Sequence, residues 1–80
     1  MVNMDSVESR VRSVFMSSFE IDESAVENVE YQSVDTWDSI GHMIMISELE
    51  SEFGITIDMD DVINISNLKT CIDKVSKYLK

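Results

Sequence analysis

The sequence predicts an all-α fold: a small four-helix bundle of three longer helices and one short helix, with a long loop between helices one and two. Three observations support this. The 80-residue chain has no proline and two glycines, a composition that favours helices. Apolar residues recur at three- and four-residue steps in three segments. With 44% hydrophobic residues, the chain can form a single compact domain over residues 1–80.

The first helix is expected over about 6–18. Asp5 and Glu8 have the spacing of a capping box, with Asp5 in the cap position. The apolar stripe that would face the core consists of Val7, Val11, Val14, Phe15 and either Ser18 or Phe19.

Residues 19–37 form a long acidic connection. A loop of that length is either functional or contains structure of its own, and one short helical turn is expected over 22–26. The apolar residues that would hold the loop on the core are Ile21, Val26, Val29, Tyr31 and Trp37.

The second helix is expected over 39–53. Asp38 is placed to cap its N-terminus, and Gly54 is placed to end it in the left-handed conformation. Ile44 lies off the apolar stripe and is expected to be partly exposed. The stripe itself is expected to contain Ile40, Met43, Met45 or Ile46, Leu49 and Phe53.

A short third helix is expected over 59–64, after an extended link at 55–57. Asp58 would cap this helix, and Val62 and Ile63 would turn inward.

The last helix would be capped by Ser66 or Asn67 and would run to about Leu79. Cys71 is expected to be a buried small hydrophobic residue. The apolar stripe of this helix consists of Leu68, Cys71, Ile72, Val75, Tyr78 and Leu79.

The charge excludes several classes of partner. Sixteen acidic residues against six basic ones give a net charge of −10, which repels nucleic acid and anionic membranes and attracts basic protein surfaces. One cysteine permits no internal disulfide, and neither a signal peptide nor a membrane span is visible. We therefore expect a cytoplasmic protein.

Neither a metal site nor a catalytic set is expected. An EF-hand loop starting at Asp58 would need Gly at its sixth position and Glu at its twelfth, but Ile63 and Lys69 occupy them. His42 follows Ser39 by one turn without a nucleophile–base–orienter set, so we expect it to be an exposed contact residue.

Ser39 stands out because it opens the second helix directly after Asp38 and between the apolar residues Trp37 and Ile40. A helix N-terminus has unpaired N–H groups and a partial positive charge, which favour a phosphate. Taken alone, the two residues favour a plain N-cap followed by an ordinary first-turn serine, and only the pattern of the whole chain favours a site.

The whole pattern resembles an acyl carrier protein over essentially the full chain. An amphipathic first helix and a long acidic loop precede Asp38-Ser39-Ile40, which stands in place of the family's usual Asp-Ser-Leu. The acidic end of the second helix and its link, residues 48–57, also match. So do residues 60–63 and the closing helix.

This resemblance implies that Ser39 carries 4′-phosphopantetheine, delivered from coenzyme A by a phosphopantetheinyl transferase. The thiol of that arm would hold acyl groups as thioesters, so the protein would be a carrier and not an enzyme. We expect a monomer whose partners are acyl-transfer, ligase or synthase enzymes of fatty-acid, polyketide or related pathways, with basic docking patches. The candidate contact residues are Asp38, His42, Ile44, Glu48, Glu50 and Glu52.

Several positions depart from the family pattern and keep alternatives open. Gly41 and Ile44 stand where acidic residues are common, which suggests a specialised pathway. A glycine after the motif is also similar to D-alanyl carriers, so an aminoacyl or peptidyl carrier is one alternative. An unmodified acidic interaction module is another. The residues that form either plain core or an acyl cavity are Met43, Met45, Ile57, Met59, Val62 and Ile63.

Overall fold

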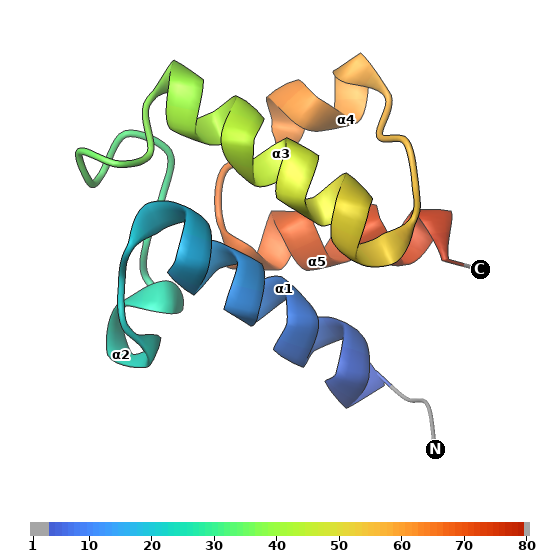
Figure 1. Cartoon of the computed structure of the whole chain (residues 1–80), viewed down its shortest axis with the longest axis horizontal. Coiled ribbons are helices and arrows are strands. Elements are labelled where there is room, and N and C mark those ends of the chain that lie inside the picture. Colours follow the sequence, from blue (N-terminus) through green and yellow to red (C-terminus); the bar gives the residue numbers. More distant parts are fainter. Residues whose placement is uncertain (1–3, 80) are drawn as a thin grey trace.

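The computed structural model describes residues 4–79, and this part of the chain is all-helical, as predicted (Figure 1). The longer helices α1, α3 and α5 pack together, and the short helix α4 lies within the segment that joins α3 to α5. The single turn predicted in the long loop is α2. The helices are α1 (Met4–Phe19), α2 (Glu23–Val26), α3 (Ser39–Phe53), α4 (Met59–Asn64) and α5 (Leu68–Tyr78).

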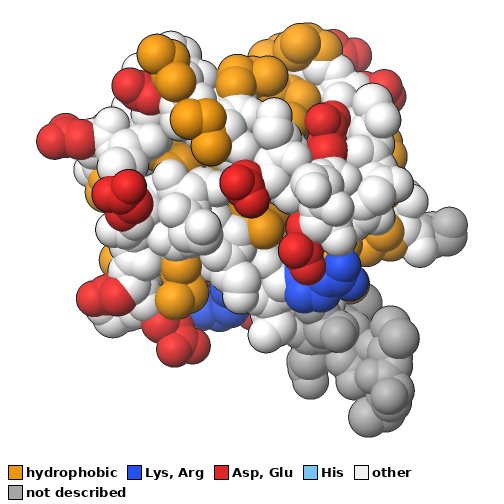
Figure 2. All heavy atoms as spheres, in the orientation of Figure 1, with side chains coloured by type: hydrophobic (Ala, Val, Ile, Leu, Met, Phe, Trp, Pro, Cys, Tyr) orange, Lys and Arg blue, Asp and Glu red, His pale blue; other side chains and the backbone are white. Residues whose placement is uncertain are grey.

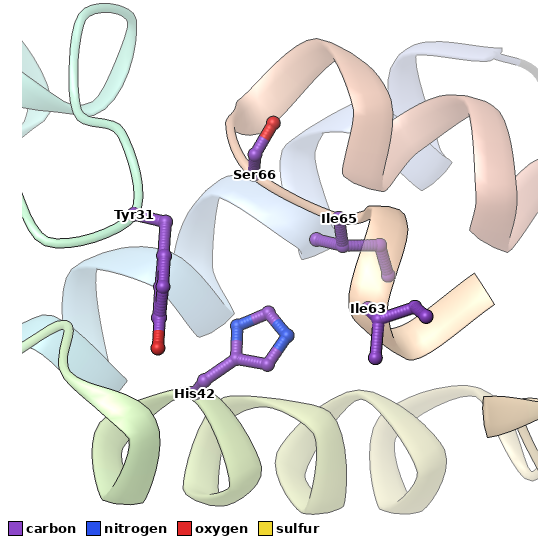
Figure 3. A pocket seen from close by; sticks show the side chains of 5 residues that line it. All are labelled: Tyr31, His42, Ile63, Ile65 and Ser66. Atoms are coloured by element: carbon purple, nitrogen blue, oxygen red, sulfur yellow. The ribbon is translucent and has the colours of Figure 1, made fainter. Parts of the chain in front are cut away.

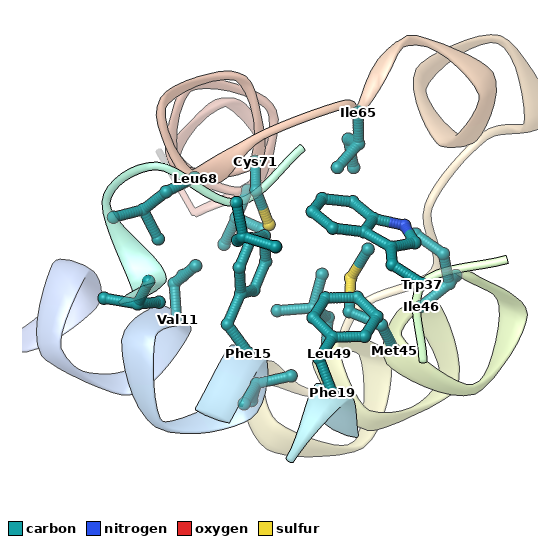
Figure 4. Packing of buried hydrophobic residues seen from close by; sticks show 14 of the residues in the cluster. Val11, Phe15, Phe19, Trp37, Met45, Ile46, Leu49, Ile65, Leu68 and Cys71 are labelled. Carbon is teal, nitrogen blue, oxygen red and sulfur yellow. The ribbon is translucent and has the colours of Figure 1, made fainter. Parts of the chain in front are cut away.

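An aromatic cluster holds the long loop on the core (Figure 4). The Trp37 ring stacks on Phe19 with centroids 4.4 Å apart and meets Phe15 edge-on at 5.3 Å. Val26 and Val29 are also buried, as predicted, and Ile21 is partly buried. Tyr31 remains exposed, although its ring lies edge-on to Trp37. The loop is therefore a packed element of the fold and sets the position of the residues that begin α3.

The start of α1 corrects one expectation. The helix already includes Met4, so Asp5 lies within its first turn and is not the residue that caps it. Acidic residues are favoured both at the cap and in the first turn, which is why the spacing alone misplaced the start. The side chain of Asp5 lies outside the part of the structure described. Phe19, and not Ser18, is the buried end of the stripe.

The two ends of α3 are those predicted, but the face assignment was partly wrong. Met45, Ile46 and Leu49 are buried, whereas Ile40 and Met43 face solvent. Ile44 is half exposed, as expected. Both faces of α3 are apolar, so the periodicity of the sequence could not determine which face meets the core.

The short helix α4 has one inward and one outward apolar residue. Val62 is buried, but Ile63 is 70% exposed, contrary to expectation. Successive helical residues are rotated by about 100°, so burial of Asp61 and Val62 turns the next residue outward. Asp58 occupies the cap position without its side chain accepting a cap hydrogen bond.

The last helix is held by a capping box and by a charged cluster. Asn67 and Thr70 exchange cap hydrogen bonds at its N-terminus. The carboxylate of Asp61 in α4 accepts hydrogen bonds from the Tyr78 hydroxyl at 2.5 Å and from Lys77 Nζ at 3.0 Å. Cys71 is buried, as predicted, whereas Leu79 follows the helix end and is 40% exposed. None of the helices described is long and apolar enough to cross a membrane.

Candidate functional site

Ser39 is the first residue of α3 and is exposed. Asp38 precedes it in an extended conformation, and Asp38 Oδ1 accepts a hydrogen bond from the Gly41 N–H at 2.8 Å. This confirms Asp38 as the N-cap. By helix geometry, the N–H groups of Ser39 and Ile40 have no intrahelical acceptor. The Ser39 hydroxyl therefore lies in solvent beside free backbone donors.

Gly41 permits a close contact between the loop and the first turn of α3. A Cβ atom at this position would lie 1.9 Å from the carbonyl oxygen of Thr36, which is part of the backbone and cannot move away cheaply. Thr36 is in turn fixed by its hydroxyl, which donates to the carbonyl of Phe19 at 2.6 Å. The glycine that suggested a D-alanyl carrier thus has a packing explanation.

His42 links α3 to the long loop and to α4. Figure 3 shows its side chain pointing from α3 toward Tyr31 and α4. The Trp37 indole Nε1–H donates to His42 Nδ1 at 2.9 Å, and His42 Nε2 lies 2.7 Å from the carbonyl oxygen of Val62. An indole N–H can only donate, so Nδ1 must accept and the proton sits on Nε2, which donates to Val62. The ring is half-buried and lies edge-on to Tyr31 at 5.4 Å. The expectation that the His42 side chain is exposed was therefore wrong, because the loop and α4 cover this side of α3. Its role as a partner contact stays a prediction.

A small pocket opens between His42 and α4 (Figure 3). Its volume is about 240 Å³, and it is on the side of α3 that carries His42. Ser39 does not line it. The lining residues are Tyr31, His42, Ile63, Ile65 and Ser66.

A larger, open groove of about 450 Å³ begins at Ser39 and follows the outward face of α3. Figure 2 shows hydrophobic side chains gathered over the start of α3 and over α4. Sequence reasoning missed this groove. Its signal in the sequence is a repeat at four-residue steps, through Ser39, Ile40, Met43, Ile44, Ser47 and Glu48.

The candidate acidic contact residues differ in their surroundings. Glu48 is exposed beside the groove. Glu50 is half-buried, and its carboxylate accepts a hydrogen bond from the Ile57 N–H at 2.9 Å, so it holds the link that follows α3. Glu52 pairs with Arg10 at 2.7 Å. The structure therefore gives Glu50 and Glu52 structural contacts in addition to any role toward a partner.

The sequence that forms this site matches a known protein family. A family described as "Phosphopantetheine attachment site" matches residues 9–75, which include the whole of α3, the long loop and α4. That family is defined by a covalently attached 4′-phosphopantetheine. The residues present fit such a group, because attachment requires a hydroxyl that an enzyme can reach and a place in solvent for a phosphodiester. Ser39 offers both.

Proposed function

Because the chain belongs to the phosphopantetheine-attachment carrier family, we propose that Ser39 bears the arm and that the protein carries acyl groups to biosynthetic enzymes. The observation that supports this most strongly is the exposed Ser39 hydroxyl at the head of α3, inside the matched region. When attached, the arm supplies a terminal thiol on which acyl groups are held as thioesters.

Other serines in the matched region lack this combination. Ser13 and Ser17 lie within α1, where the backbone N–H groups are already used by the helix. Ser24 is in the four-residue helix α2, and its hydroxyl donates to Asp22 at 2.7 Å. At Ser39 a phosphodiester would lie against the free N–H groups and the positive end of a fifteen-residue helix, a placement typically worth about 0.3–1 kcal/mol.

The neighbours of Ser39 fix the backbone turn from which its hydroxyl projects. Asp38 caps the helix, Gly41 lets the loop pack against the first turn, and His42 ties that turn to Trp37 and α4. A hydroxyl on a rigid turn can be presented to several enzymes in the same geometry.

Family membership implies interaction with phosphopantetheinyl transferases and synthase-type enzymes. We propose that their basic patches are attracted by the net charge of −10 and contact Asp38 and Glu48, with Ile44 as an apolar contact. In this proposal Glu50 and Glu52 contribute charge near the C-terminus of α3. His42 holds the first turn of α3 in position through its hydrogen bonds to Trp37 and Val62. We further propose that the protein acts as a cytoplasmic monomer without catalysis of its own.

Attachment can be tested by mass spectrometry. The unmodified protein is incubated with coenzyme A, Mg²⁺ and a broad-specificity phosphopantetheinyl transferase, alongside a second carrier as a positive control. We expect the mass of one phosphopantetheine to be added to the wild type and to Ser47→Ala, but not to Ser39→Ala. Ser47 is an exposed serine on the same helix and is the matched control. Modification of Ser39→Ala would refute the assignment, and failure to modify the wild type would refute attachment.

The cargo can be tested separately. The modified protein is offered to an acyl-thioester ligase with fatty acids and to an adenylating enzyme with amino acids. We expect loading by the ligase. Loading only by the adenylating enzyme would identify an aminoacyl carrier in place of an acyl carrier.

A further inference from the structure

The outward groove on α3 is built from two parallel rows of side chains. One row contains Ser39, Met43 and Ser47, and the other contains Ile40, Ile44 and Glu48. Residues four apart stack into ridges on a helix, and the space between neighbouring ridges forms a groove inclined to the helix axis. With a rise of about 1.5 Å per residue, this groove extends roughly 13 Å from Ser39.

The apolar part of this groove is open to water. Ile40 is 69% exposed, Met43 47% and Ile44 50%. Contiguous exposed apolar side chains on a small soluble protein mark a binding surface. The opposite face of α3, with Met45, Ile46 and Leu49, is already buried in the core.

We propose that the protein's own pantetheine arm covers this groove, lying along α3 from Ser39 toward Glu48 when no enzyme is docked. This inference rests on the proposed attachment at Ser39. The groove begins at the attachment residue, so a tethered group is always present there at high effective concentration. An independent partner has no such advantage.

The chemistry of the groove matches that of the arm. Next to its phosphate, the pantetheine chain has a carbon with two methyl groups, and the groove next to Ser39 is lined by Ile40 and Met43. Farther along, the arm has two amides whose N–H groups need acceptors. Ser47 and Glu48 offer acceptor oxygens at the far end of the groove.

The inward pocket is a poorer place for the arm. Its volume is about 240 Å³, and it lies on the side of α3 that is covered by α4 and the loop. His42 bridges Trp37 and the Val62 carbonyl across this side. The His42 ring is one wall of this pocket, and displacing it to make room for the arm would break two hydrogen bonds and leave the indole N–H without its acceptor.

Nuclear Overhauser contacts provide the test. An unlabelled arm is transferred to uniformly ¹³C-labelled protein, attachment is verified by mass, and contacts between arm protons and protein methyl groups are recorded. We expect contacts to Ile40, Met43 and Ile44 and none to Ile63. Ile63 is the comparison residue, since it is 70% exposed against 69% for Ile40 but lies on α4, where it lines the inward pocket and not the groove.

Each outcome separates the two proposals. An attached arm without groove contacts, or with contacts to Ile63 and Ile65, overturns the groove inference and leaves Ser39 attachment standing. The methyl signals of the groove residues could shift when transferase is added while showing no contacts to the arm. That result would identify the groove as a partner surface and would also overturn the inference. Absence of the added mass, with the control carrier modified, refutes both.

A second measurement uses variants of exposed residues. Ile40→Gln and Ile44→Gln remove apolar groove surface, so the docked fraction of the arm should fall. We expect the arm thiol to react with a bulky maleimide at least about twofold faster in both variants, because it is free for more of the time. Ile63→Gln should leave the rate unchanged. Equal rates in all four proteins would overturn the inference.

Discussion

The two faces of α3 carry the same kinds of side chain in opposite surroundings. Met45, Ile46 and Leu49 on the inward face are at most 3% exposed, whereas Ile40, Met43 and Ile44 on the outward face are at least 47% exposed. The inward residues meet α1 and the aromatic cluster, and the outward ones meet water. Burial on this helix is therefore decided by its neighbours, and the uncovered apolar face remains available for binding.

The largest contrast is expected between Leu49→Ala and Ile40→Ala. Leu49 is completely buried, so its truncation leaves a cavity and should lower the free energy of unfolding by about 2–5 kcal/mol. Ile40→Ala should change it by no more than about 0.5 kcal/mol. Urea unfolding followed by circular dichroism measures both. A cost above about 2 kcal/mol for Ile40→Ala would mean that the outward face is covered in solution.

Gly41→Ala tests the boundary between the two faces. The added methyl would overlap the Thr36 carbonyl oxygen, so the loop or the first turn of α3 must shift. We expect the free energy of unfolding to fall by about 1–3 kcal/mol. Ser47→Ala, at an exposed position on the same helix, should stay within about 0.5 kcal/mol. The same urea titration compares the variants. A neutral Gly41→Ala would show that the loop does not pack this closely on α3.

His42→Leu probes the polar contact on the inward side. It removes the acceptor for the Trp37 indole N–H and the donor for the Val62 carbonyl. The free energy of unfolding should therefore fall by about 1–3 kcal/mol. Trp37 fluorescence reports the change, since the indole loses its hydrogen bond. Met43→Leu, one residue along and facing outward, is the control and should leave both stability and fluorescence nearly unchanged.

The smallest effect is expected at the contact between α4 and α5, where Tyr78 and Lys77 donate hydrogen bonds to the buried carboxylate of Asp61. The hydroxyl of Tyr78 and the ammonium of Lys77 donate to Asp61 and lower the pKa of its carboxyl. The stability from this interaction is therefore complete above the unfolded pKa of about 4 and is lost as pH falls toward the lower folded value. Asp61→Asn should weaken the dependence of the thermal midpoint on pH in that acid range. An unchanged slope would contradict the assignment.

The sequence predicted those features of α3 that have local causes. Its start and end follow from Asp38 and Gly54, since one accepts the Gly41 N–H and the other adopts φ 65°. Both mechanisms involve only a few neighbouring residues, so they are visible in the sequence. Ser39 could be singled out for the same reason, although its attachment to an arm remains a prediction.

Features that depend on distant contacts were missed. His42 is turned inward by Trp37 and by Val62, twenty residues away, and no local pattern indicates that contact. The exposure of Ile40 and Ile63 likewise depends on which helices lie nearby. A helix that is apolar on both sides gives two equally good stripes, and only the tertiary arrangement selects one of them.

The burial of Cys71 has a consequence for a protein that would hold activated thioesters. Removal from water raises the pKa of the Cys71 thiol to about 12, so at neutral pH its sulfur stays protonated and is a poor nucleophile. An accessible cysteine thiolate on the carrier could take the acyl group from the arm by thiol–thioester exchange. Cys71 is the one cysteine in the sequence, and it is completely buried. An acyl group held on the arm would therefore not be transferred to a cysteine of the carrier.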